Sequence, residues 1–353
     1  MPVTLAQAQV NADADVNYMV IDNFRRYSWL LDQMVWDDTV TPGTGGGSSL
    51  TYAYTRLIEA APANFRRLNT EYTPGQAKRQ RYSVDLVPLG GAVTIDRVIA
   101  RLGNPATTEV NFQMQQLLAS TRGRFQQALI LGDPATEEDV DGFDGLDRAL
   151  TGTATEYFPG GAAMYTDWTS ASVDTADKAL SKLDEFDDFL SRLVPSTVGS
   201  IDLGAPGALP PGVRAILGNT RSITRIKSMA RRAGQFTESK DDLGRQIQTY
   251  GPWVLVDIGD RLDGAAPIIP IEARDPDGAG GGSVVSGLTD IYAVCFGMDS
   301  FHGASMAGVP LVETWLPDYT TSGAVKSGEI EFGPVAPVLK NTKACGVFRN
   351  VKV

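Results

Sequence analysis

One stripe of apolar residues constrains the fold of this 353-residue chain more than any other pattern. Its members recur at three- and four-residue steps, the spacing of one face of an α-helix: Val110, Met114, Leu117, Leu118, Phe125 and Leu129. Asn104 followed by Pro105 is a typical helix start, and Gly132 ends the pattern. A helix of this length spans about 40 Å, so the rest of the fold has to be built along it.

Two segments with period-two alternation, 50–58 and 82–89, precede this helix and predict a pair of β-strands. The long connection carries one carboxylate, Glu71, against several cations: Arg66, Arg67, Lys78, Arg79 and Arg81. An isolated two-stranded hairpin is only marginally stable in water. We therefore expect a long hairpin whose basic tip lies on a neighbouring molecule rather than on its own acidic body.

Residues 13–36 have helical spacing and contain two large aromatic residues, Trp29 and Trp36. A glycine-rich break follows at 41–49. This order predicts an amphipathic arm that exposes both tryptophans to a neighbouring subunit, because an apolar surface of that kind implies a partner. The alternative is a first core helix followed by a flexible loop.

The segment 133–147 carries seven carboxylates and no cation. It is the expected docking surface for the basic tip of an adjacent subunit, with another acidic face as the alternative. The residues expected to contact the tip are Glu137, Glu138, Asp139 and Asp141. The spacing departs from the Asp-x-Asp-x-Asp-Gly pattern of calcium loops, so we expect no metal site.

The remaining sequence mixes helices and strands. The spacing predicts a helix that is capped by Asp174 or Thr175 and ends at Pro195, and a strand at 215–218 followed by a basic helix at 222–233. A long strand and a short terminal one are expected in 327–353. Short strands are expected at 253–258, 268–271 and 291–296. No internal repeat is visible, and the expected fold class is α+β.

The sequence offers little for catalysis. The one histidine, His302, sits in a loop-like stretch and is expected to be structural or exposed, and Cys295 and Cys345 are expected to be buried free thiols. No phosphate-binding or dinucleotide-binding glycine motif is present, so no catalytic residue and no cofactor is predicted. Carboxylate pairs that meet only in the fold are left open by the sequence.

Charge and hydropathy argue against nucleic acid and membranes as the main binding partners. Lys and Arg total 31 against 42 Asp and Glu, a net charge of −11, and a chain this acidic is a poor general binder of nucleic acid. The amino terminus lacks the pattern of a signal peptide, and no stretch reaches the roughly 20 apolar residues that cross a bilayer. We expect a protein that is made in a cytosol and has no membrane partner.

Four local sequences resemble those of the HK97-type phage major capsid proteins. These are Gly142–Leu150, Asn219–Gly234, Tyr250–Gly259 with Pro267–Glu272, and Glu331–Cys345. The order of the parts also resembles that family. The resemblance implies an N-arm at 1–47, an E-loop hairpin at 48–92, a P-domain with the spine helix at 93–139, and an A-domain at 140–308. The segment 309–353 would then supply the P-domain return strand and the C-terminal end.

The resemblance implies a structural role and no enzymatic activity. Members of this family assemble into hexamers and pentamers of an icosahedral phage head that encloses double-stranded DNA. The implied partners are copies of the chain itself, a separate scaffolding protein, a portal, a decoration protein, and packaged DNA by weak non-specific contact. The implied location is the virion, assembled in the host cytoplasm. Two alternatives are an encapsulin-like nanocompartment shell and an α+β enzyme with an acidic pocket.

Overall fold

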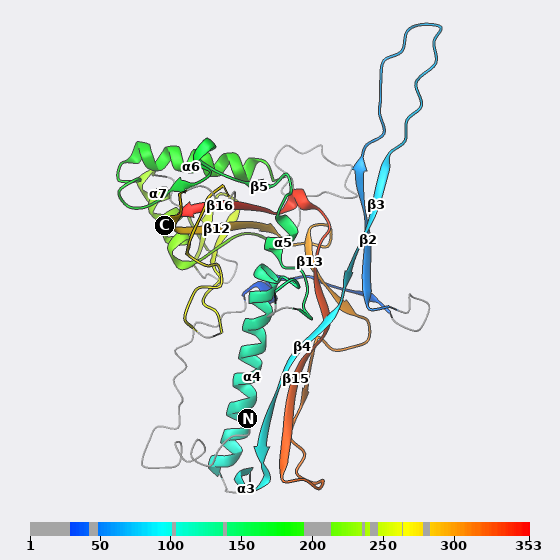
Figure 1. Cartoon of the computed structure of the whole chain (residues 1–353), viewed down its shortest axis with the longest axis vertical. Helices are drawn as coiled ribbons and strands as arrows, with labels where there is room; N and C mark the ends of the chain where they lie inside the picture. The colour runs from blue at the N-terminus through cyan, green and yellow to red at the C-terminus, as the bar shows by residue number, and fades with distance from the viewer. Residues whose placement is uncertain are drawn as a thin grey trace.

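The structure is a computed structural model that describes residues 29–41, 49–100, 104–136, 140–193, 213–234, 237–240, 246–262, 264–277 and 283–353. In these ranges the chain forms two β-sheets, a separate two-stranded hairpin and helices that pack on the sheets (Figure 1). The helices are α2 (Trp29–Gln33), α3 (Arg97–Ala100), α4 (Asn104–Leu131), α5 (Leu146–Leu150), α6 (Ala176–Ser191) and α7 (Thr220–Arg232), with short 3-10 turns at Gly161–Ala163 and Thr342–Ala344.

The five-stranded sheet is built around one long strand. Its members are β1 (Trp36–Val40), β4 (Val87–Asp96), β13 (Phe301–Met306), β14 (Val312–Trp315) and β15 (Val325–Leu339). β15 pairs antiparallel with β4, β13 and β14, and β1 pairs parallel with β13 at the edge. Figure 1 shows α4 running beside β4 and β15. The predicted spine helix is thus confirmed as α4, and the predicted long strand near the end of the sequence is β15, which lies beside it.

The nine-stranded sheet collects strands from the second half of the chain. Its members are β5 (Glu156–Tyr157), β6 (Thr166–Asp167), β7 (Arg214–Gly218), β8 (Thr237–Lys240), β9 (Gln246–Tyr250), β10 (Trp253–Asp257), β11 (Glu272–Arg274), β12 (Val285–Cys295) and β16 (Gly346–Lys352). β16 lies between β5 and β12, so the C-terminal strand is internal to the sheet. The helices α6 and α7 cover one face of this sheet through a core that contains Phe186, Ile226 and Phe348.

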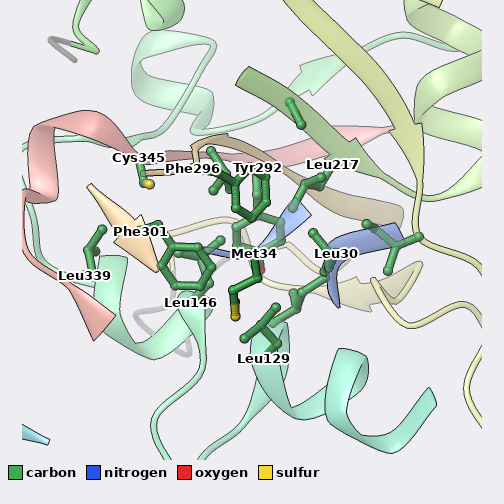
Figure 2. Packing of buried hydrophobic residues seen from close by; sticks show 14 of the residues in the cluster. Leu30, Met34, Leu129, Leu146, Leu217, Tyr292, Phe296, Phe301, Leu339 and Cys345 are labelled. Atoms are coloured by element: carbon green, nitrogen blue, oxygen red, sulfur yellow. The ribbon is translucent and has the colours of Figure 1, made fainter. Parts of the chain in front are cut away.

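A second apolar core joins the two sheets at the end of α4. Phe125 and Leu129 of α4 are each 1% exposed, and the Phe125 ring stacks on Phe332 of β15 with 5.8 Å between centroids. Figure 2 shows Leu129 close to Leu30 and Met34 of the N-terminal segment, with Tyr292 and Phe296 of the other sheet above them. Burial of apolar side chains from both sheets in one cluster holds them together.

Several expectations need correction. Residues expected to continue a helix to Trp36 instead form α2 and then β1, because Trp36–Val40 pairs with β13. No strand forms at 268–271, and β11 begins only at Glu272. β13 precedes the expected boundary at 308 but pairs with β15 in the five-stranded sheet. The domain boundaries all stay predictions. In the described part of the chain, no helix is long and apolar enough to cross a membrane.

Candidate inter-subunit surfaces

The hairpin of β2 (Thr51–Glu59) and β3 (Lys78–Asp85) projects away from both sheets (Figure 1). Its strands pair with each other from Thr51 opposite Asp85 to Glu59 opposite Lys78, and they form a two-stranded sheet of their own. Every residue from Leu57 to Arg81 is exposed. The predicted hairpin is therefore confirmed, and its outer part packs on nothing in the described part of its own chain.

The outer part of the hairpin exposes apolar side chains as well as cations. Phe65 is fully exposed, Leu68 is 89% exposed and Tyr72 is 63% exposed, and Leu57 and Ile58 are exposed on β2. Exposed Phe and Leu side chains in a polar loop are characteristic of an interaction site, because they gain free energy only when another molecule covers them. The composition of this surface, apolar with basic neighbours, suits a protein partner with carboxylates at its edge.

The predicted cations divide between the loop and the strand. Arg66 lies near the tip, where its guanidinium donates to the Thr70 carbonyl and lies 5.3 Å from the Tyr72 ring. Arg67 is also in the loop, whereas Lys78, Arg79 and Arg81 lie on β3 rather than in the connection. Lys78 makes a 2.6 Å ion pair with Glu59 across the strands, but both side chains are exposed, so this pair contributes at most about 1 kcal/mol.

The base of the hairpin is bonded to the body through residues that the sequence interpretation missed. Tyr52 is buried and its hydroxyl donates to the Asp37 carboxylate of β1 at 2.8 Å. Burial opposes ionisation of Asp37, but hydrogen bonds from Tyr52 and Thr39 outweigh it, so the pKa of this carboxyl lies below its usual value. Lys340 lies 3.9 Å from the same carboxylate and adds to this effect.

A second anchor holds the hairpin to the end of β15. The Arg56 guanidinium donates to the Lys340 carbonyl at 2.8 Å and to the Leu339 carbonyl. It also lies over the Tyr82 ring at 4.4 Å, and the Tyr54 hydroxyl donates to the Leu339 carbonyl at 3.1 Å. The alternation of Tyr52, Tyr54 and Arg56 on one face of β2 was a visible signal of this contact. These bonds fix the direction in which the exposed hairpin projects.

Three carboxylates of the acidic segment form ion pairs inside their own subunit. Arg148 pairs with Asp133 and, at 2.9 Å, with Asp144, and Arg349 binds Asp147. The expectation of an uncompensated acidic surface over 133–147 is therefore wrong for these three carboxylates, because their partners follow the segment along the chain. Asp141 is exposed, while Glu137, Glu138 and Asp139 lie outside the described residues. Docking of the basic tip on Asp141 stays a prediction.

The two tryptophans of the predicted arm pack on their own chain. The Trp29 ring lies edge-on to Phe296 with centroids 6.0 Å apart, and the Trp36 ring lies 6.0 Å from Phe125 of the spine helix. Both are partly buried against the apolar core that joins the two sheets at the end of α4. The expected exposed apolar face is therefore wrong for this part, and the alternative of a core segment fits residues 29–40. Residues 13–28 lie outside the described residues.

The single histidine is part of the hairpin anchor. His302 lies on β13 rather than in a loop, is completely buried, and packs edge-on against the Tyr52 ring with centroids 5.8 Å apart. Burial, with a smaller contribution from the positive charge of Lys340, lowers its pKa to about 4. Neither ring nitrogen has a hydrogen-bond partner in the described part of the chain, so His302 is a neutral core residue there.

The two thiols are buried as expected. Cys295 and Cys345 are both free, and burial raises the pKa of Cys345 to about 12, so this thiol is not a nucleophile at neutral pH. The described residues contain no group of three or more His, Cys, Asp or Glu side chains that could hold a metal ion. The exposed hairpin, with the contacts that anchor its base, is therefore the main candidate for a functional surface.

Comparison with solved structures identifies the fold. The chain is similar to the holo-SrpI encapsulin complex of Synechococcus elongatus, with a TM-score of 0.59, 12% identity, and coverage of 100% of this chain and 97% of that one. It is also similar to the capsid of a native GTA particle, with a TM-score of 0.54, 11% identity and coverage of 96% and 94%. The chain has the HK97-type capsid fold.

The HK97-type fold is shared by further capsids at similarly low identity. The capsid of Myoviridae phage XM1 aligns with a TM-score of 0.52, 10% identity, and coverage of 98% of each chain. No family model and no curated protein sequence matches the chain. The shared feature is therefore the arrangement of elements.

Proposed function

We propose that this chain is the major capsid protein of a phage and assembles into the hexamers and pentamers of an icosahedral head that encloses double-stranded DNA. The observation that carries the proposal is the exposed hairpin, which has apolar side chains at its tip and two anchors at its base. A rigidly directed and otherwise unsupported hairpin is stabilised when it lies on an adjacent copy.

Repetition of one such contact explains a closed assembly. A hairpin of one subunit on the body of the next is a heterologous contact, and heterologous contacts form rings when the rotation closes. Each subunit then gives one contact and receives one. Contacts that are weak singly become strong together, because a subunit held by one neighbour meets the next at high effective concentration.

The site residues follow from this proposal. The basic tip, defined as Arg66, Arg67, Lys78, Arg79 and Arg81, would contact carboxylates of an adjacent subunit, with Asp141 as one candidate. Phe65 and Leu68 would be covered in the same contact. We propose that packaged DNA makes only weak contacts, since the chain has a net charge of −11. A separate scaffolding protein, a portal and a decoration protein would complete the particle in the host cytoplasm.

A second candidate function is an encapsulin-like protein shell. It is favoured by the encapsulin structure above, which aligns over all of this chain. Negative-stain electron microscopy of the expressed full-length chain tests both candidates at once. Uniform closed particles are expected, and a monomer or dimer under all assembly conditions would contradict both.

The two candidates differ in their contents. Particles recovered from lysed cells of the native source can be treated with nuclease and then opened. Protected double-stranded DNA of uniform length supports the phage head, whereas a co-purifying protein in DNA-free particles supports the compartment.

A further inference from the structure

The two helices on the nine-stranded sheet carry opposite charge. α7 has only cations among its charged residues: Arg221, Arg225, Lys227, Arg231 and Arg232. α6 carries mostly carboxylates: Asp177, Asp184, Glu185, Asp187 and Asp188, against two lysines. Both helices bury their apolar sides in the same core, and Figure 1 shows them on the side of the molecule away from the hairpin. Their charged sides therefore form an acidic outer face of α6 and a basic outer face of α7.

Contacts within the subunit leave part of this charge unpaired. Arg225 and Arg232 donate to the Ser170 hydroxyl and the Val173 carbonyl, and the two lysines of α6 are held by nearby carboxylates. Arg221, Arg231, Asp184 and Asp188 are among the exposed residues of these helices that have no ion-pair partner in the described part of the chain. α6 thus presents negative charges, and α7 presents positive charges, that form no ion pair within the subunit.

The placement of these charges is unfavourable for an isolated subunit. Arg221 lies in the first turn of α7, beside the positive end of the helix dipole, and Asp188 lies in the last turn of α6, beside the negative end. Asp184 and Asp188 are also a like-charged pair four residues apart. Burial raises the pKa of Asp187 between them, and its two carboxylate neighbours raise it further, against a hydrogen bond from Tyr250.

We propose that the basic outer face of α7 contacts the acidic outer face of α6 on a second copy of this chain. The contact is head to tail, with Arg221 and Arg231 of one copy facing Asp184 and Asp188 of the next. This inference rests on the proposed shell function, and it names a second contact, separate from the hairpin. Charges placed where they destabilise the free subunit are expected at a surface that binds a partner.

A second copy fits the observations better than a nucleic-acid phosphate. A phosphate backbone would neutralise the basic face of α7 but would leave the acidic face of α6 as crowded as before. A neighbouring copy satisfies both faces in the same contact, and the next copy repeats it around the ring. The charge distribution across such a contact also selects the register of adjacent subunits.

A charge exchange in the full-length chain tests the proposal. One variant carries Arg221→Glu and Arg231→Glu, a second carries Asp184→Lys and Asp188→Lys, and a third combines all four. Each double variant should lower the yield of closed particles by about tenfold or more, because like charges then face each other. The fourfold variant should recover the yield, because the pairs are restored with exchanged sign.

Folding is followed in the same variants. The Asp184→Lys, Asp188→Lys subunit should melt at the same temperature as the wild-type subunit or higher, because it removes a like-charged pair and suits the helix dipole. A loss of particles without a loss of stability separates contact from folding. The matched control is Arg221→Lys with Arg231→Lys, which keeps the charge and should keep the particle yield near that of the wild type.

The outcomes separate this inference from the proposed function. If the wild type forms particles and either reversed double variant forms them equally well, the helix contact is wrong and the shell function stands. The helix contact is also wrong if the fourfold variant does not recover the particle yield. It is wrong as well if the Arg221→Glu, Arg231→Glu variant forms particles normally and only retains less nucleic acid. If the wild type forms no particles, the proposed function itself fails.

Discussion

The hydroxyl of Tyr52 donates a 2.8 Å hydrogen bond to the carboxylate of Asp37, and this bond links the first strand of the hairpin to the edge of the five-stranded sheet. Both residues are buried, and the acceptor is a carboxylate. Hydrogen bonds to charged acceptors are roughly twice as strong as neutral ones. The direction of the hairpin therefore depends on a bond between two residues that are 15 positions apart in the sequence.

Replacing Tyr52 with Phe should lower the free energy of unfolding by about 2 kcal/mol, because it removes the hydrogen bond and leaves the Asp37 carboxylate with less compensation. Chemical denaturation measures this loss. Tyr72→Phe is the matched control, since Tyr72 is 63% exposed on the outer hairpin and should change stability little. Equal stability of the two variants would mean that the bond does not hold the hairpin.

Acidification should destabilise the subunit through His302. Its pKa is lowered from 6.5 to about 4 by burial and by the charge of Lys340, so the folded chain binds fewer protons here than the unfolded chain between these two values. The stability from this residue is complete above pH 6.5 and falls by about 3 kcal/mol as the pH drops to about 4. Denaturation of the wild type and of His302→Leu from pH 7.5 to pH 4 isolates this contribution, because the chain contains one histidine. Parallel curves would contradict the assignment.

Arg56→Ala should leave the sheets folded but release the outer hairpin, since the side chain bonds two carbonyls at the end of β15 and lies over Tyr82. We expect faster amide hydrogen exchange in β2 and β3 and a lower yield of particles. Arg79→Ala on the exposed part of β3 should leave hydrogen exchange unchanged. Unaltered protection in the Arg56 variant would show that the tyrosines alone anchor the hairpin.

The basic tip should affect assembly without affecting folding. A chain with Arg66, Arg67 and Arg79 all changed to Glu keeps its melting temperature, because these residues are exposed. Its particle yield should fall, and replacement of the same three residues by Lys should preserve it. Normal particles from the Glu variant, counted by electron microscopy, would exclude a role of tip charge in docking.

Replacing the tryptophans should lower the stability of the subunit rather than affect assembly alone. Trp36→Ala removes a ring that lies against Phe125, so it should cost about 3 kcal/mol and favour aggregation. Gly303→Ala tests the same packing from the other side, because a Cβ there would lie 2.5 Å from the Trp36 ring. Both variants should show a lowered thermal midpoint, with Phe65→Ala, a fully exposed aromatic residue, as the unaffected control. Stable Trp36→Ala subunits that fail to assemble would instead revive the exposed arm.

Features set by neighbours in the sequence could be predicted, and features set by distant pairing could not. The spine helix and the hairpin follow from their own periodicities. The helix was found where expected, whereas the second hairpin strand lies at Lys78–Asp85 rather than at 82–89. β1 was mistaken for helix because its partner β13 lies far along the chain. Asp147 was taken as free because its partner Arg349 is 202 residues away, whereas Arg148, which pairs with Asp133 and Asp144, directly follows the segment. The hairpin anchors were missed for the same reason, since Leu339 and Lys340 lie far from Tyr54 and Arg56.

The internal position of β16 sets the time at which the subunit can be completed during its synthesis. β16 lies between β5 and β12, and its Arg349 makes ion pairs with Glu156 and Asp290 at 2.9 and 3.2 Å. All the other strands precede it along the chain, so the nine-stranded sheet stays open until Gly346–Lys352 has left the ribosome. Earlier parts of a nascent chain fold first, and an unfinished subunit would therefore present a hairpin before it had a complete body on which a neighbour's hairpin could lie. Late closure of this sheet would keep an unfinished subunit from receiving the hairpin of a neighbour.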